Sequence, residues 1–180
     1  MTNILQLARC LDRRSEPRLP SGIRIRTYLG QDDVARWLDL RRAAFAREKV
    51  GVGDWLTQDF EREFLAKPWW RPDRMWFAEF DPSGDQSLAA ADRPVGTVAV
   101  GAITVGTVTL ALRGQGPDAK PVVHWLAVRP AYRGRGIARA LVAAVEQAAW
   151  DAGHRQVWLE THSGWTAASA CYRALGYAEV

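Results

Sequence analysis

The sequence of 180 residues has only two cysteines, Cys10 and Cys171, and they lie far apart. This excludes a disulfide framework and favours a reducing, cytoplasmic compartment. Neither the cysteines nor the histidines show the spacing of a metal site, so we expect no metal. Long apolar runs are also missing, and the N-terminus lacks the regions of a secretory signal. We therefore expect a cytoplasmic protein without membrane contact.

Long runs of one charge are absent as well. The 24 lysines and arginines exceed the 20 acidic residues by a formal net charge of +4, which is too mild an excess to indicate a nucleic-acid partner. The arginines are nevertheless concentrated in one place, between Arg129 and Arg139. That concentration favours a local site for an anion.

The stretch Val122–Ala149 (VVHWLAVRPAYRGRGIARALVAAVEQAA) predicts a strand, a glycine-rich turn and a long helix. Backbone N–H groups at a helix start lack helical partners and lie at the positive end of the helix dipole, so they suit a phosphate. Gly134 and Gly136 permit the required backbone angles and a close approach of the ligand. Arg133 and Arg135 can add charge-assisted hydrogen bonds. The turn lacks the Gly-Lys-Ser/Thr ending of a P-loop and the third glycine of a dinucleotide motif.

The rest of the chain predicts alternating strands and helices in one domain, residues 23–180. Expected strands are Ile23–Tyr28, Arg74–Phe80, Val122–Val128 and Arg155–Thr161, and expected helices are Val34–Arg47, Asp54–Ala66, the helix after Gly136 and one capped by Ser163. The last two expected strands should be parallel, because a helix connects them by a right-handed crossover. Val95–Leu112 is expected to be one bent strand with bulges at Gly101 and Gly106, with a hairpin as the alternative. Residues 1–22 are expected to be an appendage, with one or two helical turns followed by a linker.

Two motifs in the second half resemble those of the GNAT superfamily of acyl-CoA-dependent N-acyltransferases. Its signature is Arg or Gln, two residues, Gly, one residue, and Gly or Ala, and it is matched by Arg133, Gly136 and Ala138. A later helix with Ala-x-x-x-Tyr before Gly-aromatic is matched by Ala168, Tyr172 and Gly176-Tyr177. The resemblance covers Val122 to Val180. It implies an α/β (α+β) fold, with a mixed, mostly antiparallel sheet flanked by helices and a splayed parallel strand pair at the CoA site.

The resemblance also implies acetyl-CoA, or CoA, as the co-substrate. The pyrophosphate would lie on the backbone amides of Arg133–Ala138, and the pantetheine arm would pair with the main chain of Leu126–Val128. Trp165 stands where the family often has Asn, so Ser169 is a candidate substitute. The expected cofactor-binding residues are Leu126, Ala127, Val128, Arg133, Gly134, Arg135, Gly136, Ile137, Ala138 and Ser169.

By the same resemblance, Tyr172 would be the general acid that protonates the CoA thiolate, because a phenol is protonated at neutral pH. A position in the core is the alternative role for Tyr172. His124, which strand alternation puts on one face with Val122, Leu126 and Val128, is a candidate general base or a structural histidine. His162 is the second candidate base. Trp69 and Trp70, in the loop after Ala66, are candidate substrate contacts or packing residues.

The sequence therefore predicts an N-acetyltransferase, monomeric or homodimeric, that moves an acetyl group from acetyl-CoA to a primary amine of a small molecule or peptide by direct attack. The alternative is an inactive acyl-CoA-binding sensor or interaction domain. In the family a further strand usually follows the Gly-aromatic pair, whereas this sequence stops at Val180. Either that strand is missing, or another segment or a partner chain replaces it.

Overall fold

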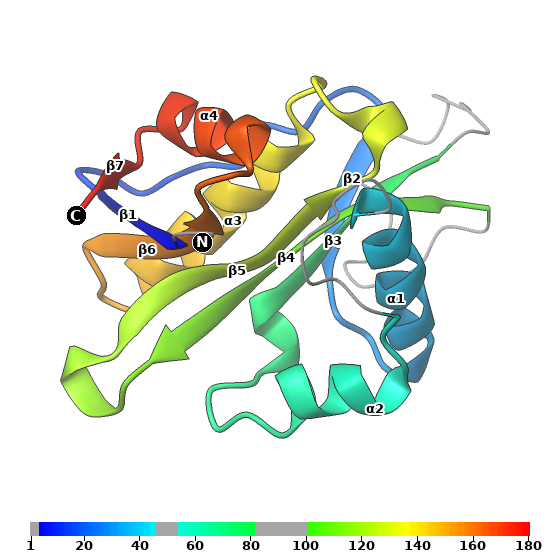
Figure 1. Ribbon diagram of the computed structural model, residues 1–180, viewed down its shortest axis with the longest axis horizontal. Helices are drawn as coiled ribbons and strands as arrows, with labels where there is room; N and C mark the ends of the chain where they lie inside the picture. Colours follow the sequence, from blue (N-terminus) through cyan, green and yellow to red (C-terminus); the bar gives the residue numbers. More distant parts are fainter. Residues whose placement is uncertain (1–3, 46–53, 82–100) are drawn as a thin grey trace.

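The computed structural model describes residues 4–45, 54–81 and 101–180 (Figure 1). The strands form one sheet of seven in the order β2-β3-β4-β5-β6-β1-β7. The strands are β1 (Ile4–Cys10), β2 (Ile23–Thr27), β3 (Met75–Phe80), β4 (Ile103–Arg113), β5 (Lys120–Val128), β6 (Gln156–His162) and β7 (Ala178–Glu179). The helices are α1 (Gln31–Phe45), α2 (Thr57–Phe60), which continues as a π-helical turn (Glu61–Leu65), α3 (Ile137–Asp151) and α4 (Thr166–Ala174). Single 3₁₀ turns cover Pro72–Arg74, Gly116–Asp118 and Pro130–Tyr132.

Every strand pair in this sheet is antiparallel except β5 with β6. α3 connects these two strands and gives the expected parallel crossover. The predicted fold class, a mostly antiparallel sheet with one parallel pair and flanking helices, is therefore confirmed.

Hydrophobic clusters lie on both faces of the sheet, because side chains of a strand alternate between faces. On β3, Trp76 and Ala78 belong to a cluster with Leu141 and other residues of α3. Met75 and Phe77 belong to a second cluster with residues of α1 and α2. α3 thus covers one face, while α1 and α2 cover the other.

β1 lies inside the sheet, between β6 and β7, so the expectation of a helical appendage at residues 1–22 is wrong. Leu7 pairs with Leu159 of β6 and with Glu179 of β7, and its side chain is fully buried. A short apolar run such as that of β1 fits a strand or a helix equally well. Here the segment forms a strand because it pairs with the edge of β6. A short strand, β7, does follow the Gly-aromatic pair, and β1 lies between it and β6.

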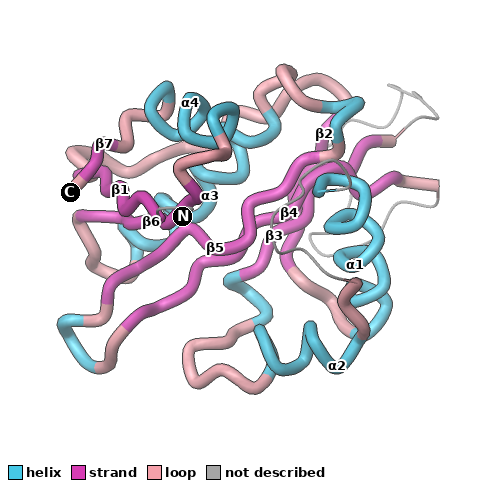
Figure 2. Tube along the Cα trace, viewed as in Figure 1, coloured by secondary structure: helices cyan, strands magenta, loops and turns pink. Residues whose placement is uncertain are grey.

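A buried carboxylate on α3 hydrogen-bonds residues near both ends of the chain. Glu146 is 2% exposed and accepts hydrogen bonds from Arg9 at 2.9 Å, Ser15 at 2.7 Å and the Tyr177 hydroxyl at 3.1 Å. Burial and the neighbouring Glu146 raise the pKa of Tyr177, so that hydroxyl keeps its proton and remains a donor. The segment after β1 then runs as a loop toward β2 (Figure 2).

The expected bent strand at Val95–Leu112 is β4 from Ile103 onward, while Val95–Val100 lie outside the described residues. Gly101 precedes the strand. The register against β3 shifts near Gly106, between Ala78 and Glu79. A Cβ at Gly106 would lie 2.9 Å from Leu141 Cδ1 and 3.1 Å from Ile137 Cγ2. Glycine at this position therefore lets α3 pack closely on the sheet.

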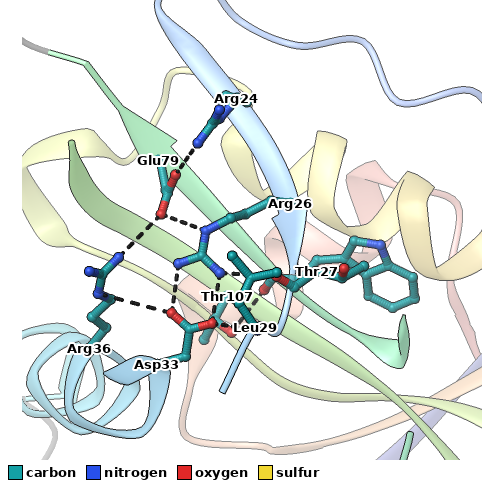
Figure 3. Close-up of polar contacts among 9 residues, drawn as sticks. Arg24, Arg26, Thr27, Leu29, Asp33, Arg36, Glu79 and Thr107 are labelled. Atoms are coloured by element: carbon teal, nitrogen blue, oxygen red, sulfur yellow. Dashed lines mark hydrogen bonds and ion pairs between the residues drawn. The ribbon is translucent and has the colours of Figure 1, made fainter. Parts of the chain in front are cut away.

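A buried ion network attaches α1 to the edge of the sheet (Figure 3). Arg26 of β2 donates to both carboxylate oxygens of Asp33, at 2.7 and 2.6 Å, and to Glu79 of β3 at 2.8 Å. All three residues are at most 3% exposed. Arg24 and Arg36 flank the same carboxylates. Each buried charge thus has a partner of opposite sign.

Arg26→Ala is expected to lower the free energy of unfolding by about 3–5 kcal/mol, because it leaves two buried carboxylates without their central partner. Urea denaturation followed by circular dichroism measures the change. Arg62→Ala is the matched control, since Arg62 also bonds an aspartate but its side chain is 76% exposed, and it should change stability little. Equal effects of the two substitutions would contradict a special role for the buried network.

Candidate active site

The glycine-rich turn between β5 and α3 has the geometry expected of an anion site. Gly134 and Gly136 have φ angles of 75° and 84°, in the region that favours glycine. The first helical hydrogen bond of α3 runs from the Ala140 amide to the Gly136 carbonyl at 3.0 Å. The amides of Ile137 and Ala138 therefore precede the helical ladder and remain available to a ligand.

The arginine side chains of this turn are engaged with the protein itself. Arg133 donates to the carbonyls of Val128 at 3.1 Å and Ala44 at 2.8 Å, and so links the turn to the end of α1. The Arg135 guanidinium lies 5.1 Å from the Tyr132 ring centroid. The backbone amide of Arg133 is engaged as well, because it donates to the Pro130 carbonyl at 3.2 Å. Arg133 therefore supports the turn, and the free amides for an anion belong to the residues that follow it.

The parallel strands separate beside this turn. β5 and β6 pair only at Val122↔Trp158 and Val123↔Leu159. The register of β5 against β4 then shifts between Thr107 and Thr109, which places an extra residue in β5, a β-bulge. Trp125 lies in this bulge and has a φ of 50°, the one positive value outside glycine in the described chain. The bulge bends β5 away from β6, so the main chain of Leu126–Val128 faces the opening.

The bulge places His124 on a different face of the sheet from Leu126 and Val128, so the expectation that they share one face is wrong. Val128 and Leu126 pack with the cluster beneath α3, whereas the His124 ring lies against Phe64 on the α2 side, at 5.8 Å between centroids. Strand alternation alone puts these residues on one face. The extra residue in the bulge moves them to opposite faces.

Several buried polar atoms without hydrogen-bond partners belong to the segment from the end of β6 to the first turns of α4. Within the described residues they include Thr161 Oγ1 and His162 Nδ1 at the end of β6, and Trp165 Nε1 and Ser169 Oγ at the start of α4. Thr161 and Ser169 are each 5% exposed. Since buried polar groups are nearly always paired, such a concentration is typical of a wall that hydrogen-bonds a ligand. Ser169 was expected here, while Thr161 and Trp165 were not.

Tyr172 lies on α4, one helical turn after Ala168, and is 9% exposed. Burial raises the pKa of Tyr172 well above that of a free phenol. The hydroxyl therefore keeps its proton throughout the neutral range. Its ring lies 6.3 Å from that of Tyr177, so Tyr172 also contributes to the core, which was the alternative role.

A carboxylate that the sequence did not single out lies beside His124. Glu63, in the π-helical turn after α2, has its Oε1 atom 2.9 Å from His124 Nε2 and accepts from Trp125 Nε1 at 3.1 Å. Hydrogen bonding by His124, followed by that of Trp125, lowers the pKa of Glu63. Glu63 belongs to no motif, because its link to His124 exists only in the folded chain.

The two tryptophans proposed as substrate contacts have different surroundings. The Trp69 ring lies 5.8 Å from that of His124, so Trp69 is beside the candidate base. The Trp70 ring lies 5.3 Å from that of Tyr28 and packs with the cluster under α1 and α2. The other candidate base, His162, lies against Trp165 with ring centroids 5.0 Å apart.

The described ranges of the chain hold no group of three histidine, cysteine, aspartate or glutamate side chains that could bind a metal ion. No helix among them has the length and apolar character needed to cross a membrane.

Comparison with known proteins agrees with this geometry. The family model described as Acetyltransferase (GNAT) family matches residues 49–177. Mycothiol acetyltransferase of Mycobacterium ulcerans is 32% identical over 181 residues, covering 97% of this chain and 53% of that protein. The homologue of the same name from Thermobispora bispora is 33% identical, covering 89% and 48%. The chain thus spans about half the length of these curated relatives.

Solved structures show the same fold. A GCN5-related N-acetyltransferase from Sphaerobacter thermophilus aligns with a TM-score of 0.72 at 23% identity, over 99% of this chain and 49% of that one. The aminoglycoside N-acetyltransferase AAC(6')-Iy in complex with CoA aligns with a TM-score of 0.60 at 20% identity, over 91% and 92%. With the family model matching most of the sequence, the chain belongs to the acetyltransferase (GNAT) family.

Proposed function

We propose that this chain transfers an acetyl group from acetyl-CoA to a primary amine of a small molecule or peptide. The observation that supports this best is the separation of β5 from β6 after Val123, directly beside the glycine turn. Beyond Val123, β5 is no longer paired with β6, and buried polar atoms without partners occur at the end of β6 and the start of α4. This donor set fits the amides and carbonyls of a pantetheine arm.

Of the expected amides of Arg133–Ala138, those after Arg133 would bind the pyrophosphate, because the Arg133 amide donates to Pro130. The main chain of Leu126–Val128 would pair with pantetheine as an added strand does. Ser169 Oγ would donate to the same arm. From His124 to Pro130, β5 and the residues after it extend roughly 20 Å. This length is comparable to that of an extended pantetheine arm, so the thioester would come close to His124 when the pyrophosphate is on the turn.

The chain then needs to supply two proton transfers. The neutral amine attacks the thioester carbonyl carbon, a C–N bond forms and the C–S bond breaks. His124 would accept the proton that the amine nitrogen loses, directly or through water, and Tyr172 would give its proton to the departing sulfur. The raised pKa of Tyr172 supports the role of an acid. Most of the acceleration would come from holding amine and thioester together.

The acceptor side favours a cationic small molecule. Glu63 and Trp69 both lie beside His124, and a carboxylate next to an aromatic ring suits an ammonium group before it loses its proton. Named relatives and structural neighbours include acetyltransferases of mycothiol and of aminoglycosides. Amino sugars and aminoglycosides are therefore the first acceptors to test.

The test supplies acetyl-CoA and a panel of amines, follows free CoA with a thiol reagent, and detects the acetylated product by mass spectrometry. One class of amine should raise the rate of CoA release well above the rate without acceptor. If CoA binds in calorimetry but no amine accelerates its release, the chain is an acyl-CoA-binding domain without transferase activity.

A further inference from the structure

We propose that Glu63 is a positioning residue that orients His124 and fixes the tautomer in which His124 Nδ1 accepts the proton of the amine. This inference rests on the proposed function, because it gives His124 the role of base. The 2.9 Å contact joins His124 Nε2 to Glu63 Oε1. An ionised carboxylate can only accept, so the proton of a neutral imidazole lies on Nε2 and the lone pair on Nδ1.

The bulge in β5 is what brings two consecutive side chains to this carboxylate. Neighbouring residues of a regular strand point to opposite faces of the sheet. Here His124 Nε2 and Trp125 Nε1 both meet Glu63 Oε1, at 2.9 and 3.1 Å. This arrangement requires the positive φ of Trp125, an angle that bulky residues seldom adopt. The unusual backbone therefore has a specific result, a carboxylate held by two donors next to the thioester position.

The burial of the pair supports an oriented contact rather than a loose surface ion pair. The side chains of His124 and Glu63 are 25% and 29% exposed. Phe64 and Trp69 flank the imidazole. The lowered pKa of Glu63 keeps it ionised at neutral pH. The carboxylate is thus an acceptor under the conditions in which the base must work.

Other charged groups near the pair come from several elements. Glu160 of β6 interacts with the charge of His124, but it is bound by Arg113 and by Gln6. Lys67, after the π-helical turn, acts on Glu63. The Arg41 guanidinium of α1 lies over the Trp125 ring, 5.4 Å from its centroid. Glu63 is the carboxylate in direct contact with the imidazole, so its charge has the largest effect on it.

A double-mutant cycle on kcat distinguishes positioning from a purely structural role. Glu63→Gln replaces the ionised acceptor by a neutral amide of the same shape, so His124 loses its fixed orientation and kcat should fall about 10-fold. His124→Gln should lower kcat at least as much, and adding Glu63→Gln to it should cause no further loss, because Glu63 acts through His124. Glu61→Gln, on the same turn with its side chain in solvent, should leave kcat unchanged.

The tautomer can be measured in the wild-type protein without relying on a variant that folds. Nitrogen-15 NMR of the imidazoles, with His124 assigned from the spectrum of His124→Gln, should show the Nε2–H form. A predominant Nδ1–H form would overturn the proposal, as would an unchanged kcat in folded Glu63→Gln, or a loss of kcat that is independent of His124. If the wild type acetylates no amine at all, the proposed function itself fails, and that result is distinct from both.

Discussion

Tyr172→Phe is expected to lower kcat by about 100-fold or more, while the Kd for CoA changes little. The substitution removes only the hydroxyl that would protonate the departing CoA thiolate. The remaining ring can occupy the same space beside Tyr177, so the fold of α4 should persist. Because burial raises the pKa of Tyr172, the wild-type phenol is protonated across the neutral range, and the defect should be similar from pH 6 to pH 9.

Steady-state turnover with the best acceptor and calorimetry with CoA measure the two quantities. Tyr177→Phe is the matched control, because it removes a buried phenol that bonds Glu146 and has no proposed role at the thioester. It should reduce stability and leave kcat nearly unchanged. Full turnover in folded Tyr172→Phe would remove Tyr172 from the mechanism and leave it with a role in packing.

Gly136→Val is expected to weaken CoA binding by about 100-fold or more. Gly136 has a φ of 84°, which a β-branched residue resists, so the turn would rearrange and its amides would no longer converge on the pyrophosphate. Losing two hydrogen bonds to a charged group, at about 1.5–3 kcal/mol each, corresponds to at least this change in affinity.

Gly153→Val is the control that distinguishes the effect of backbone strain from the effect on CoA binding. Gly153 has a φ of 91° at the opposite end of α3, so the substitution imposes a similar backbone cost far from the turn. Both variants should lose stability in thermal unfolding, and only Gly136→Val should lose affinity for CoA in calorimetry. Unaltered affinity in Gly136→Val would show that the pyrophosphate lies elsewhere.

The glycine turn and the two helices of the candidate site could be predicted because their signals are local. The glycines of the turn, the start of α3 and the helix with Tyr172 are each set by residues close together in the sequence. A helix N-terminus presents free amides wherever it occurs. The family signature then added the chemistry of CoA to that local geometry.

The acceptor side could not be predicted, because its contacts join distant segments. Glu63 meets His124 only after the turn following α2 has packed against β5. Strand alternation gave the wrong face for His124, since nothing in VVHWLAV marks a bulge at Trp125. The sequence ILQLARC was also misinterpreted, because its partner strand lies far away in the chain. Long-range pairing can override local preference in both cases.

The place of β1 has a consequence for the synthesis of the protein. Gln6 and Glu160 bond across β1 and β6, yet 154 residues separate them. At about 5–20 residues per second, the ribosome makes the partner strand roughly 8–30 s after β1. Throughout that time Leu7 has no core to enter, and the nascent strand is open to chaperones and to pairing with other chains. β1 thus waits for a partner strand that is made much later, and closing this long loop should limit the rate of folding.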